Sequence, residues 1–345
     1  MRTTGIITCF NHSGYIGAAI ESLAPQVDEI IVVDDCSRDD SVDVIRRHAA
    51  MYPHLRMIAL ETNVGPSAAF NRGAEVATGQ VLVLQGGDDL SLPGRVERQL
   101  ALLDDADMVY SLPELIDEDG KPLPDFSGRE FFPDLPSPDQ DLLPTLFLIG
   151  NFICAPSACV TMSAFRAVGP FDEQLELLQD YLLWMKIAAQ GAIRFSRTRD
   201  VAYRKHAGNL SARQVSFDSP LNRRLAAEFG IARLRALSGF SSEVLWNLLQ
   251  HVNTQIPLSA PPSDHVMRWL ICAQHSSSIL RSAAVAHVAD GQVTNADLAS
   301  ISDDPRGLLR QLLVTADVDA LHHKEELFLT MRAYAGLVEE ITLDQ

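Results

Sequence analysis

The chain has 345 residues, of which 47% are hydrophobic and 21% are charged, a composition typical of a globular protein with one large or two smaller domains. Its formal net charge of -17 argues against nucleic-acid binding and against attachment to anionic lipid through basic residues. The same charge means that a phosphate-bearing ligand needs a cation or local positive groups to approach. The five cysteines form no CxxC pair, which favours reduced thiols over a disulfide framework.

The sequence predicts no transmembrane segment. It begins MRTTGIITCF, without a hydrophobic leader before a cleavage site. Its most apolar window, Leu142–Met162, is interrupted by Pro144, Asn151 and Pro156, which indicates a buried core segment. Together with the reduced cysteines, this predicts a cytoplasmic protein, either free or peripheral at the inner face of the membrane.

Strand and helix signals alternate along the first hundred residues. Apolar runs predict buried strands at Thr4–Phe10, Asp28–Asp35, Leu55–Leu60 and Gly79–Gln85. Helical periodicity predicts helices at Ser13–Leu23 with Ser13 as the cap, after the turn Ser37–Asp40, at Pro66–Ala77 and near Pro93–Leu103. Continuous apolar strands separated by helices indicate a parallel sheet covered on both faces.

The pattern changes from Asp107 onward. We expect a strand there, then a turn at Glu118–Gly120, a proline-rich loop at Phe131–Asp141, a strand at Ala155–Met162, a turn leading into a helix at Phe165–Gly191, and a pair of strands within Ala192–His206. The rest is rich in Leu and Ala and helical in period, with breaks at Pro257–Asp264 and Asp290–Asn295. The sequence therefore predicts two domains, 1–215 and a helical 216–345.

Polar side chains follow three of the predicted strands, namely Thr8 with Asn11, Asp34 with Asp35, and Asp88 with Asp89. Because ligands of parallel α/β sheets bind at the carboxyl ends of the strands, these residues are candidates for one site. The Asp34–Asp35 pair has two interpretations. It caps the next helix from a solvated loop, or one carboxylate accepts hydrogen bonds from a base or a sugar.

Asp88 and Asp89 are the most informative pair. Adjacent carboxylates repel each other unless a cation relieves the repulsion, and oxygen ligands suit Mg²⁺ or Mn²⁺ bound together with substrate phosphates. Gly86 and Gly87 would let a bulky ligand approach the backbone closely. The alternative is that one of the two carboxylates caps the helix near Pro93.

Asp180 and His206 each have two interpretations. Asp180 lies among apolar residues in ELLQDYLLWMK and is either an exposed helix-face residue or a partly desolvated general base. His206 is either an ordinary surface residue or, with Arg204 and Lys205 beside it, part of a phosphate site. Periodicity does not decide between these interpretations.

With these predicted elements and motifs in this order along the chain, the sequence resembles the family-2 glycosyltransferases of the GT-A fold. The resemblance runs from about Thr4 to Ser211 and rests on the segments ITCFNHSGYIGAAIESL, EIIVVDDCSRDDS, NVGPSAAFNRGAEVATGQVLVLQGGDD, LPGRVERQ, VGPFDE, QDYLLW and YRKHAGNLS. It implies an α/β fold with a Rossmann-like, mostly parallel sheet that binds a nucleotide sugar, to which the helical period of residues 216–345 adds a C-terminal helical domain. It also implies an inverting enzyme of the hexosyltransferase type that uses a nucleoside-diphosphate sugar, most commonly a UDP-sugar, in surface polysaccharide or other glycan biosynthesis.

The resemblance also implies roles for individual residues. Those implied to hold the nucleotide sugar are Thr8, Phe10, Asn11, Asp35, Asn63, Gly65, Asn71, Asp88 and His206. Asp88 and Asp89 match the family's DxD-type motif, and with His206 they are the implied ligands of Mn²⁺ or Mg²⁺. Asp180 matches the catalytic base, which deprotonates an acceptor hydroxyl so that its oxygen displaces the nucleoside diphosphate in one in-line step. The segment after His206 would close over the site as a lid.

The chain departs from the family pattern at three positions. Gly86 stands where the DxD-type motif has its leading acid, Gln179 where an acid often precedes the base, and Phe10 where the family often has Tyr. The first departure affects how many protein ligands the metal has. The third keeps stacking on the base without a hydroxyl.

Other classes of protein fit the sequence less well. A sugar nucleotidyltransferase would carry a Gly-rich loop with Arg or Lys after the first strand, and a dinucleotide-dependent dehydrogenase a GxGxxG turn, but the chain has CFNHSGY there. A non-catalytic nucleotide-sugar or glycan-binding protein derived from such an enzyme stays open. The presence of Asp88, Asp89, Asp180 and His206 together favours the enzyme.

The sequence leaves the acceptor open among a glycan, a lipid-linked precursor, a protein and a small metabolite. Residues 216–345 fall outside the resemblance. Their Leu/Ala-rich helices favour packing on the catalytic domain or homo-oligomerisation over acceptor recognition.

Overall fold

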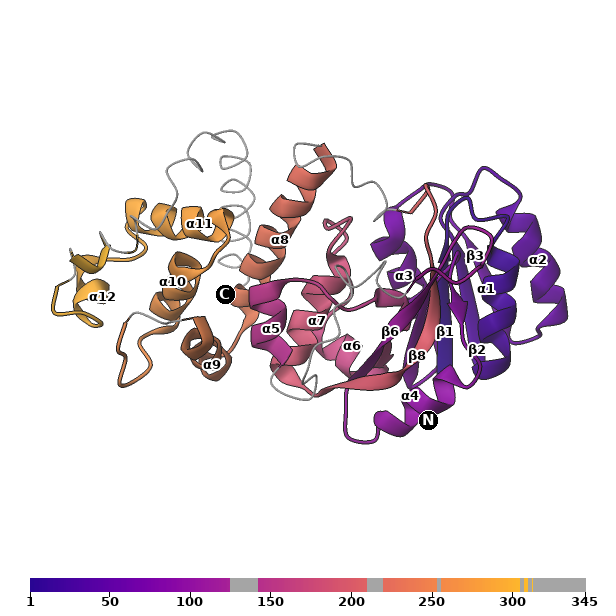
Figure 1. Cartoon of the computed structure of the whole chain (residues 1–345), viewed down its shortest axis with the longest axis horizontal. Coiled ribbons are helices and arrows are strands. Elements are labelled where there is room, and N and C mark those ends of the chain that lie inside the picture. Colours follow the sequence, from indigo (N-terminus) through magenta and orange to yellow (C-terminus); the bar gives the residue numbers. More distant parts are fainter. Residues whose placement is uncertain (125–141, 210–219, 253–255, 305–306, 310–311, 313–345) are drawn as a thin grey trace. The chain divides into compact units, whose positions relative to one another are not determined.

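The structure is a computed structural model of the chain, and it describes all residues except 125–141, 210–219, 253–255, 305–306, 310–311 and 313–345 (Figure 1). The predicted loop Phe131–Asp141, the predicted lid after His206 from residue 210 on, and the end of the helical tail lie outside the described residues. The chain divides into two compact units. The first contains Met1–Leu142 and Asn151–Val215, and the second Leu143–Gly150 and Ser216–Gln345.

The first unit is built on an eight-stranded sheet, in the order β3-β2-β1-β4-β7-β6-β8-β5. The strands are β1 (Thr3–Cys9), β2 (Glu29–Asp34), β3 (Leu55–Ala59), β4 (Val81–Gly86), β5 (Leu90–Ser91), β6 (Met108–Ile116), β7 (Cys159–Thr161) and β8 (Ile193–Arg204). The first four strands are parallel, and β7 runs antiparallel to its neighbours β4 and β6. The predicted parallel sheet is therefore confirmed, with an antiparallel strand inserted at its centre.

Helices cover both faces of this sheet. They are α1 (Ile16–Leu23), α2 (Ser41–Met51), α3 (Gly65–Val76), α4 (Arg95–Leu102), α6 (Met162–Val168) and α7 (Gln179–Gln190). Side chains of α1, α2 and α4 form one buried cluster with β1 residues such as Ile7, whereas α3 packs on the opposite face, where a Cβ at Gly73 would lie 2.8 Å from Ile6 (Figure 1). The alternation of Ile6 and Ile7 between the two faces follows from the two-residue period of a strand.

Three predicted details are wrong. Ser13 does not cap α1, which begins three residues later at Ile16 without a side-chain cap. Ala192–His206 holds one long strand, β8, instead of a pair, because a register shift near Pro113 lets one strand stay paired with β6 over most of its length. The predicted strand Ala155–Met162 shortens to Cys159–Thr161 and is followed directly by α6.

The second unit is helical throughout its described part. Its helices are α5 (Leu142–Ile149), α8 (Pro220–Gly239), α9 (Ser242–Val252), α10 (Asp264–Gln274), α11 (Ser278–Ala289) and α12 (Asn295–Ala299). The fully buried Trp269 of α10 donates its indole N–H to the carbonyl oxygen of Ala284 on α11 at 3.1 Å. The predicted breaks fall between α9 and α10 and between α11 and α12. Among the described helices, none combines the length and the apolar character that a bilayer-spanning segment needs.

Candidate active site

The strand register brings the predicted polar residues to one edge of the sheet. Thr8 pairs with Val33 of β2 on one side and with Gly86 of β4 on the other. Just beyond the strands, the Gly87 amide donates to the Thr8 carbonyl oxygen at 2.9 Å. Three strand ends that are far apart in the sequence are therefore adjacent, as ligand sites on such sheets require.

The loops after β1 and β2 are joined to each other at this edge. The Asn11 amide donates to Ser37 Oγ at 2.9 Å, and Asn11 Oδ1 accepts from the Arg38 amide at 2.7 Å. Asn11 has a φ of 56°, in the left-handed region that few non-glycine residues adopt. The neighbouring Phe10 is 42% exposed, so its ring is available for stacking. The β1 loop is thus held in a defined conformation with an aromatic ring at its surface.

Asp35 lies next to two other predicted site residues, Asn63 and Gly65. Its carboxylate oxygens accept from the amides of Val64 at 2.7 Å and Gly65 at 2.9 Å, and its carbonyl oxygen accepts from Asn63 Nδ2 at 3.2 Å. Gly65 is the first residue of α3, so the carboxylate of Asp35 faces the start of that helix. Asp34 and Asp35 are both buried, and neither caps α2. The interpretation of this pair as a cap in a solvated loop is wrong.

Asn71 lies apart from these loops. Its side-chain amide bonds both the carbonyl oxygen and the amide of Phe171, at 2.9 and 3.0 Å, and it is only 4% exposed. The residue therefore fixes the segment before α7 against α3. This structural role differs from the nucleotide contact that the resemblance implies.

Asp88 is the meeting point of the site. Its Oδ2 lies 3.0 Å from His206 Nε2, 3.1 Å from Asn209 Nδ2 and 3.9 Å from His12 Nε2. Burial alone would raise the pKa of Asp88, but the hydrogen bond to His206 and the nearby His12 outweigh it, so its pKa lies below the usual value. Asp88 is thus kept as a carboxylate beside two imidazole rings.

The hydrogen bonds assign the tautomer of His206. The Gly208 amide donates to His206 Nδ1 at 3.1 Å, and a backbone amide can only donate. In the neutral ring the proton is therefore on Nε2, where it points at Asp88 Oδ2. As arranged, His206 offers an N–H donor to an anionic oxygen.

Asp89 is more deeply buried than Asp88. It is 2% exposed, and its Oδ1 accepts from the Arg204 amide at 2.9 Å. Burial and the charge of Asp88 raise the pKa of Asp89 well above its usual value, against the positive charges of Arg204 and Arg95. Arg204 also donates from Nε to the Asp88 carbonyl oxygen at 2.8 Å. One residue at the end of β8 therefore holds both aspartates in place.

The carboxylates of Asp88 and Asp89 leave little room for a side chain at Gly86, the position where the resemblance has a leading acid. A Cβ at position 86 would lie 2.7 Å from Asp89 Oδ2 and 2.8 Å from Asp88 Oδ1, closer than side chains tolerate. The two carboxylates thus fold over the space that a side chain at Gly86 would occupy. The alternative interpretation, in which one of them caps the following helix, is wrong, because β5 intervenes and α4 has no side-chain cap.

Asp180 lies in the first turn of α7 and is partly exposed. Its Oδ2 accepts from Asn151 Nδ2 at 3.0 Å, and its Oδ1 accepts from the Tyr181 amide at 2.7 Å. Burial raises the pKa of the Cys154 thiol, and the negative charges of both Asp89 and Asp180 raise it further. Asp180 is thus held at the start of α7 by two hydrogen bonds, one of them from the side chain of Asn151.

Two residues of this site, His12 and Tyr15, are not singled out by the sequence patterns. The Tyr15 ring lies between the Arg204 guanidinium, 4.7 Å from its centroid, and the His206 ring, at 5.1 Å. His12 stands 6.1 Å from His206, centroid to centroid, and its pKa is lowered by burial and by that neighbour. The one available signal is their place in FNHSGY, directly after the first strand.

The residues at this corner fit a divalent cation. His12, Asp88 and His206 each carry one atom of a ligating type, and these three atoms lie within 4.8 Å of one another, although His206 Nε2 carries a proton while the Gly208 contact persists. His12 Nε2 faces Asp88 Oδ2 at 3.9 Å, while its Nδ1 is buried and has no hydrogen-bond partner among the described residues. Asp89 is not part of this cluster, and its burial does not support the role of metal ligand that the sequence predicts for it.

The sequence is similar to that of known glycosyltransferases. Residues 4–168 match the family described as Glycosyl transferase family 2. EpsE of Bacillus subtilis, named as a putative glycosyltransferase, is 28% identical over 197 residues, which cover 55% of this chain and 68% of EpsE. The succinoglycan biosynthesis protein ExoO of Rhizobium meliloti is 28% identical over 249 residues, 70% of this chain and 71% of ExoO.

Coverage of other relatives is lower. The chain is 32% identical over 209 residues to an uncharacterised glycosyltransferase of Rickettsia conorii, but it spans 33% of that protein.

Among solved structures, S. aureus TarS residues 1–349, crystallised with UDP, superposes with a TM-score of 0.55 at 17% identity over 97% of this chain and 92% of that one. The mannosyltransferase PcManGT of Pyrobaculum calidifontis, in complex with GDP-Man and Mn²⁺, gives 0.52 at 19% over 93% and 87%.

The fold, the order of the motifs and these relatives agree. Residues 4–168 thus resemble glycosyltransferase family 2, and the fold is the GT-A fold with a C-terminal helical region.

Proposed function

We propose that the protein is an inverting glycosyltransferase that moves a sugar from a nucleoside-diphosphate donor to an acceptor hydroxyl. The observation that carries this proposal is the meeting of Asp88, His206 and His12 at the carboxyl ends of β1 and β4. A donor at this edge would meet imidazole nitrogens and a cation-binding carboxylate at its diphosphate, which answers the difficulty posed by a net charge of -17. The complexes of TarS with UDP and UDP-GlcNAc, and of PcManGT with GDP-Man, support this class of donor.

Asp88 and His12 are the residues that would hold the divalent cation. A mixed set of carboxylate, imidazole and phosphate oxygens suits Mn²⁺, the ion present in the PcManGT complex. When bound, the cation would neutralise the charge that develops on the leaving diphosphate. His206 as arranged donates its Nε2 proton instead of a lone pair, so it would bond a diphosphate oxygen while the Gly208 contact persists.

Asp180 is the proposed base for the acceptor. Its carboxylate takes the proton of the acceptor hydroxyl as that oxygen forms its bond to the anomeric carbon. The bond from this carbon to the diphosphate breaks at the same time, and the configuration inverts. Asn151, which donates to Asp180 Oδ2, fixes the direction of the carboxylate.

The experiment that tests the proposed function is a thermal-shift screen of nucleoside diphosphates with and without Mn²⁺. A ligand that binds only the folded state raises the melting temperature, and the proposal expects a diphosphate that does so only with the metal. Transfer assays with the donor that emerges then separate enzyme from binding protein. A nucleotide that binds without transfer or hydrolysis across a broad panel of donors and acceptors would favour a non-catalytic sugar-nucleotide-binding protein.

For the helical unit we propose packing or homo-oligomerisation as the main role. Its helices bury large apolar side chains, which is what packing requires. One observation favours acceptor recognition as a second candidate. The unit contains a pocket of about 460 Å³ lined by residues that include Phe229, Arg233 and Ile279. Substitution Ile279→Trp, which would fill this pocket, is expected to leave transfer unchanged, and loss of acceptor use at unchanged oligomeric state would show a recognition role.

A further inference from the structure

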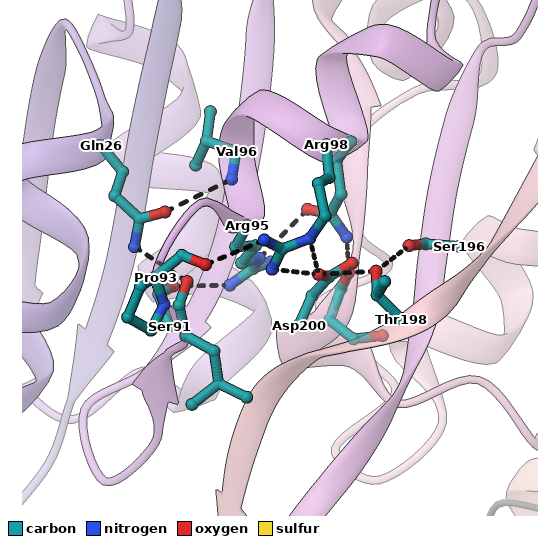
Figure 2. Close-up of polar contacts among 12 residues, drawn as sticks. Gln26, Ser91, Pro93, Arg95, Val96, Arg98, Ser196, Thr198 and Asp200 are labelled. Carbon is teal, nitrogen blue, oxygen red and sulfur yellow. Dashed lines mark hydrogen bonds and ion pairs between the residues drawn. The ribbon is translucent and has the colours of Figure 1, made fainter.

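Arg95 at the start of α4 is fully buried and, among the described residues, has no carboxylate as a hydrogen-bond partner (Figure 2). Its Nε donates to Gln99 Oε1 at 3.1 Å and its Nη1 to Ser91 Oγ at 2.9 Å. Its Nη2 donates to the carbonyl oxygens of Leu84 at 3.0 Å and Ala158 at 3.2 Å. A buried guanidinium held only by neutral oxygens is costly, and less polar side chains fill cores at lower cost. Packing alone therefore does not explain this residue.

The hydrogen bonds that begin at Arg95 run in one direction to the aspartate pair. Because a guanidinium can only donate, the Ser91 hydroxyl that accepts from it must turn its own proton elsewhere, and it donates to Gln85 Oε1 at 2.5 Å. This leaves the Gln85 amide nitrogen as the donor, which bonds the carbonyl oxygens of Ala19 at 2.9 Å and Asp89 at 3.3 Å. The peptide that carries Asp89 is thus oriented by a chain of contacts from Arg95.

The same guanidinium also fixes the strand that ends at this corner. Leu84 lies on β4 two residues before Gly86, and its amide donates to the carbonyl oxygen of Ala158 at 3.0 Å. Arg95 Nη2 bonds both carbonyl groups of this junction. Arg95 therefore links β4, two residues before Gly86, to Ala158, the residue before β7. The turn that carries Asp88 and Asp89 follows directly on this end of β4.

We infer that Arg95 is a positioning residue for the donor site, acting through Ser91 and Gln85 to fix the turn from which Asp88 reaches His206. This inference rests on the proposed function for its consequence in diphosphate binding. Its geometric part, the fixing of the Asp88–His206 contact, stands independently of any ligand.

The structure offers one substitution on the path and one control away from it for the test (Figure 2). Ser91→Ala removes a buried hydroxyl between Arg95 and Gln85. Thr198→Val removes a hydroxyl on the other side, where Thr198 Oγ1 donates to Asp200 Oδ1 at 3.0 Å beside the Arg98 ion pair at 2.7 Å. Both changes delete one hydroxyl, that of the buried Ser91 or that of the exposed Thr198, and only the first lies on the path to Asp89.

The measurement is the dissociation constant of uridine diphosphate with Mn²⁺ for each variant. Guanosine diphosphate is the second probe, and the bare nucleoside is the reference. A loss confined to the diphosphates indicates positioning, whereas a loss shared by the nucleoside indicates general destabilisation. Ser91→Ala is expected to weaken diphosphate binding roughly ten-fold and nucleoside binding less than about two-fold, whereas Thr198→Val changes neither. Arg95→Lys keeps the positive charge but loses the planar guanidinium with its several N–H donors. It is expected to weaken diphosphate binding to the same extent as Ser91→Ala.

Crystal structures of Ser91→Ala and of the wild type provide the readout that needs no ligand. The expected result is a separation of Asp88 Oδ2 from His206 Nε2 longer than the 3.0 Å of the wild type. An unchanged corner together with diphosphate affinities equal to those of Thr198→Val would overturn the positioning role. A wild type that binds no diphosphate would instead count against the proposed function, while the crystallographic comparison still decides on Arg95.

Discussion

The carboxylate of Asp88 and the imidazole of His206 meet at 3.0 Å although 118 positions separate them in the chain. The contact joins the end of β4 to the turn after β8, and Asn209 adds a second donor from the same turn at 3.1 Å. A negative group is thereby surrounded by donors at the edge where ligands of this fold bind. The predictions below follow from this contact and from the residues that support it.

His206 is expected to act through the proton on Nε2. A glutamine at this position keeps an N–H donor near Asp88, whereas an alanine does not. We predict that His206→Gln lowers the affinity for a nucleoside diphosphate with Mn²⁺ by less than roughly ten-fold, and that His206→Ala lowers it by more, since a hydrogen bond to a charged group contributes about 1.5–3 kcal/mol. Calorimetric titration of both variants measures this. Equal losses for Gln and Ala would indicate direct metal ligation by the ring instead.

Restoring the family's leading acid is expected to harm the protein. Gly86→Asp adds a carboxylate to the motif, but its Cβ would lie within 2.8 Å of oxygens of Asp88 and Asp89. We predict a loss of about 1–3 kcal/mol in the free energy of unfolding and weaker Mn²⁺ binding. Gly14→Ala is the matched control, because a Cβ there meets nothing within 4 Å. Urea denaturation of the two variants checks this, and tighter metal binding by Gly86→Asp would contradict it.

Removal of the proposed base separates catalysis from binding. Asp180→Asn keeps the size of the side chain, and its amide oxygen can still accept a hydrogen bond from Asn151. An amide, however, cannot take up the proton of the acceptor hydroxyl. We predict that kcat falls roughly a hundred- to ten-thousand-fold while the dissociation constant of the donor changes little. Steady-state rates and donor titration on the same preparation measure both. Retention of most of the rate would assign the base to another residue.

Asp39 gives a pH dependence of stability. Burial alone would raise its pKa, but hydrogen bonds from Ser41 and Ser13 lower it to about 2, from the usual 3.8. A carboxylate whose pKa is lower in the folded state stabilises the protein above the unfolded value, and this stabilisation is lost as the pH falls from about 4 toward 2. We therefore predict that Asp39→Asn is less stable than the wild type at pH 7 and that the difference shrinks below pH 3. Urea denaturation at both pH values tests this, and a difference that does not change with pH would contradict it.

The sequence predicts the sheet well, because the sheet depends on local patterns, and the same patterns place the candidate site residues at its carboxyl edge. Apolar runs that end in polar residues place Thr8, Asp35 and Asp88 at the ends of parallel strands, and parallel strands share their carboxyl edge. The first four strands and the helices between them accordingly appear within a few residues of their predicted bounds.

The contacts within the site were beyond reach of such patterns. His12 reaches Asp88 through a turn whose shape depends on bonds to Ser41 and Asp39, and no periodicity encodes such bonds. Asp89 and Asp88 are equivalent in the sequence pattern, yet Asp89 is buried and accepts a hydrogen bond from the Arg204 amide. The packing of Leu143–Gly150 with the second unit likewise depends on helices that follow much later in the chain.

The role of Asp88 is decided by titrating uridine diphosphate into the wild type and into Asp88→Asn, each with and without Mn²⁺, using guanosine diphosphate as the second probe. The proposed site predicts that the wild type binds one of these diphosphates substantially only with Mn²⁺. It also predicts that Asp88→Asn weakens that binding roughly a hundred-fold, equivalent to about 2.7 kcal/mol. Diphosphate binding that is equally tight without the metal, or that is unchanged in Asp88→Asn, would contradict it.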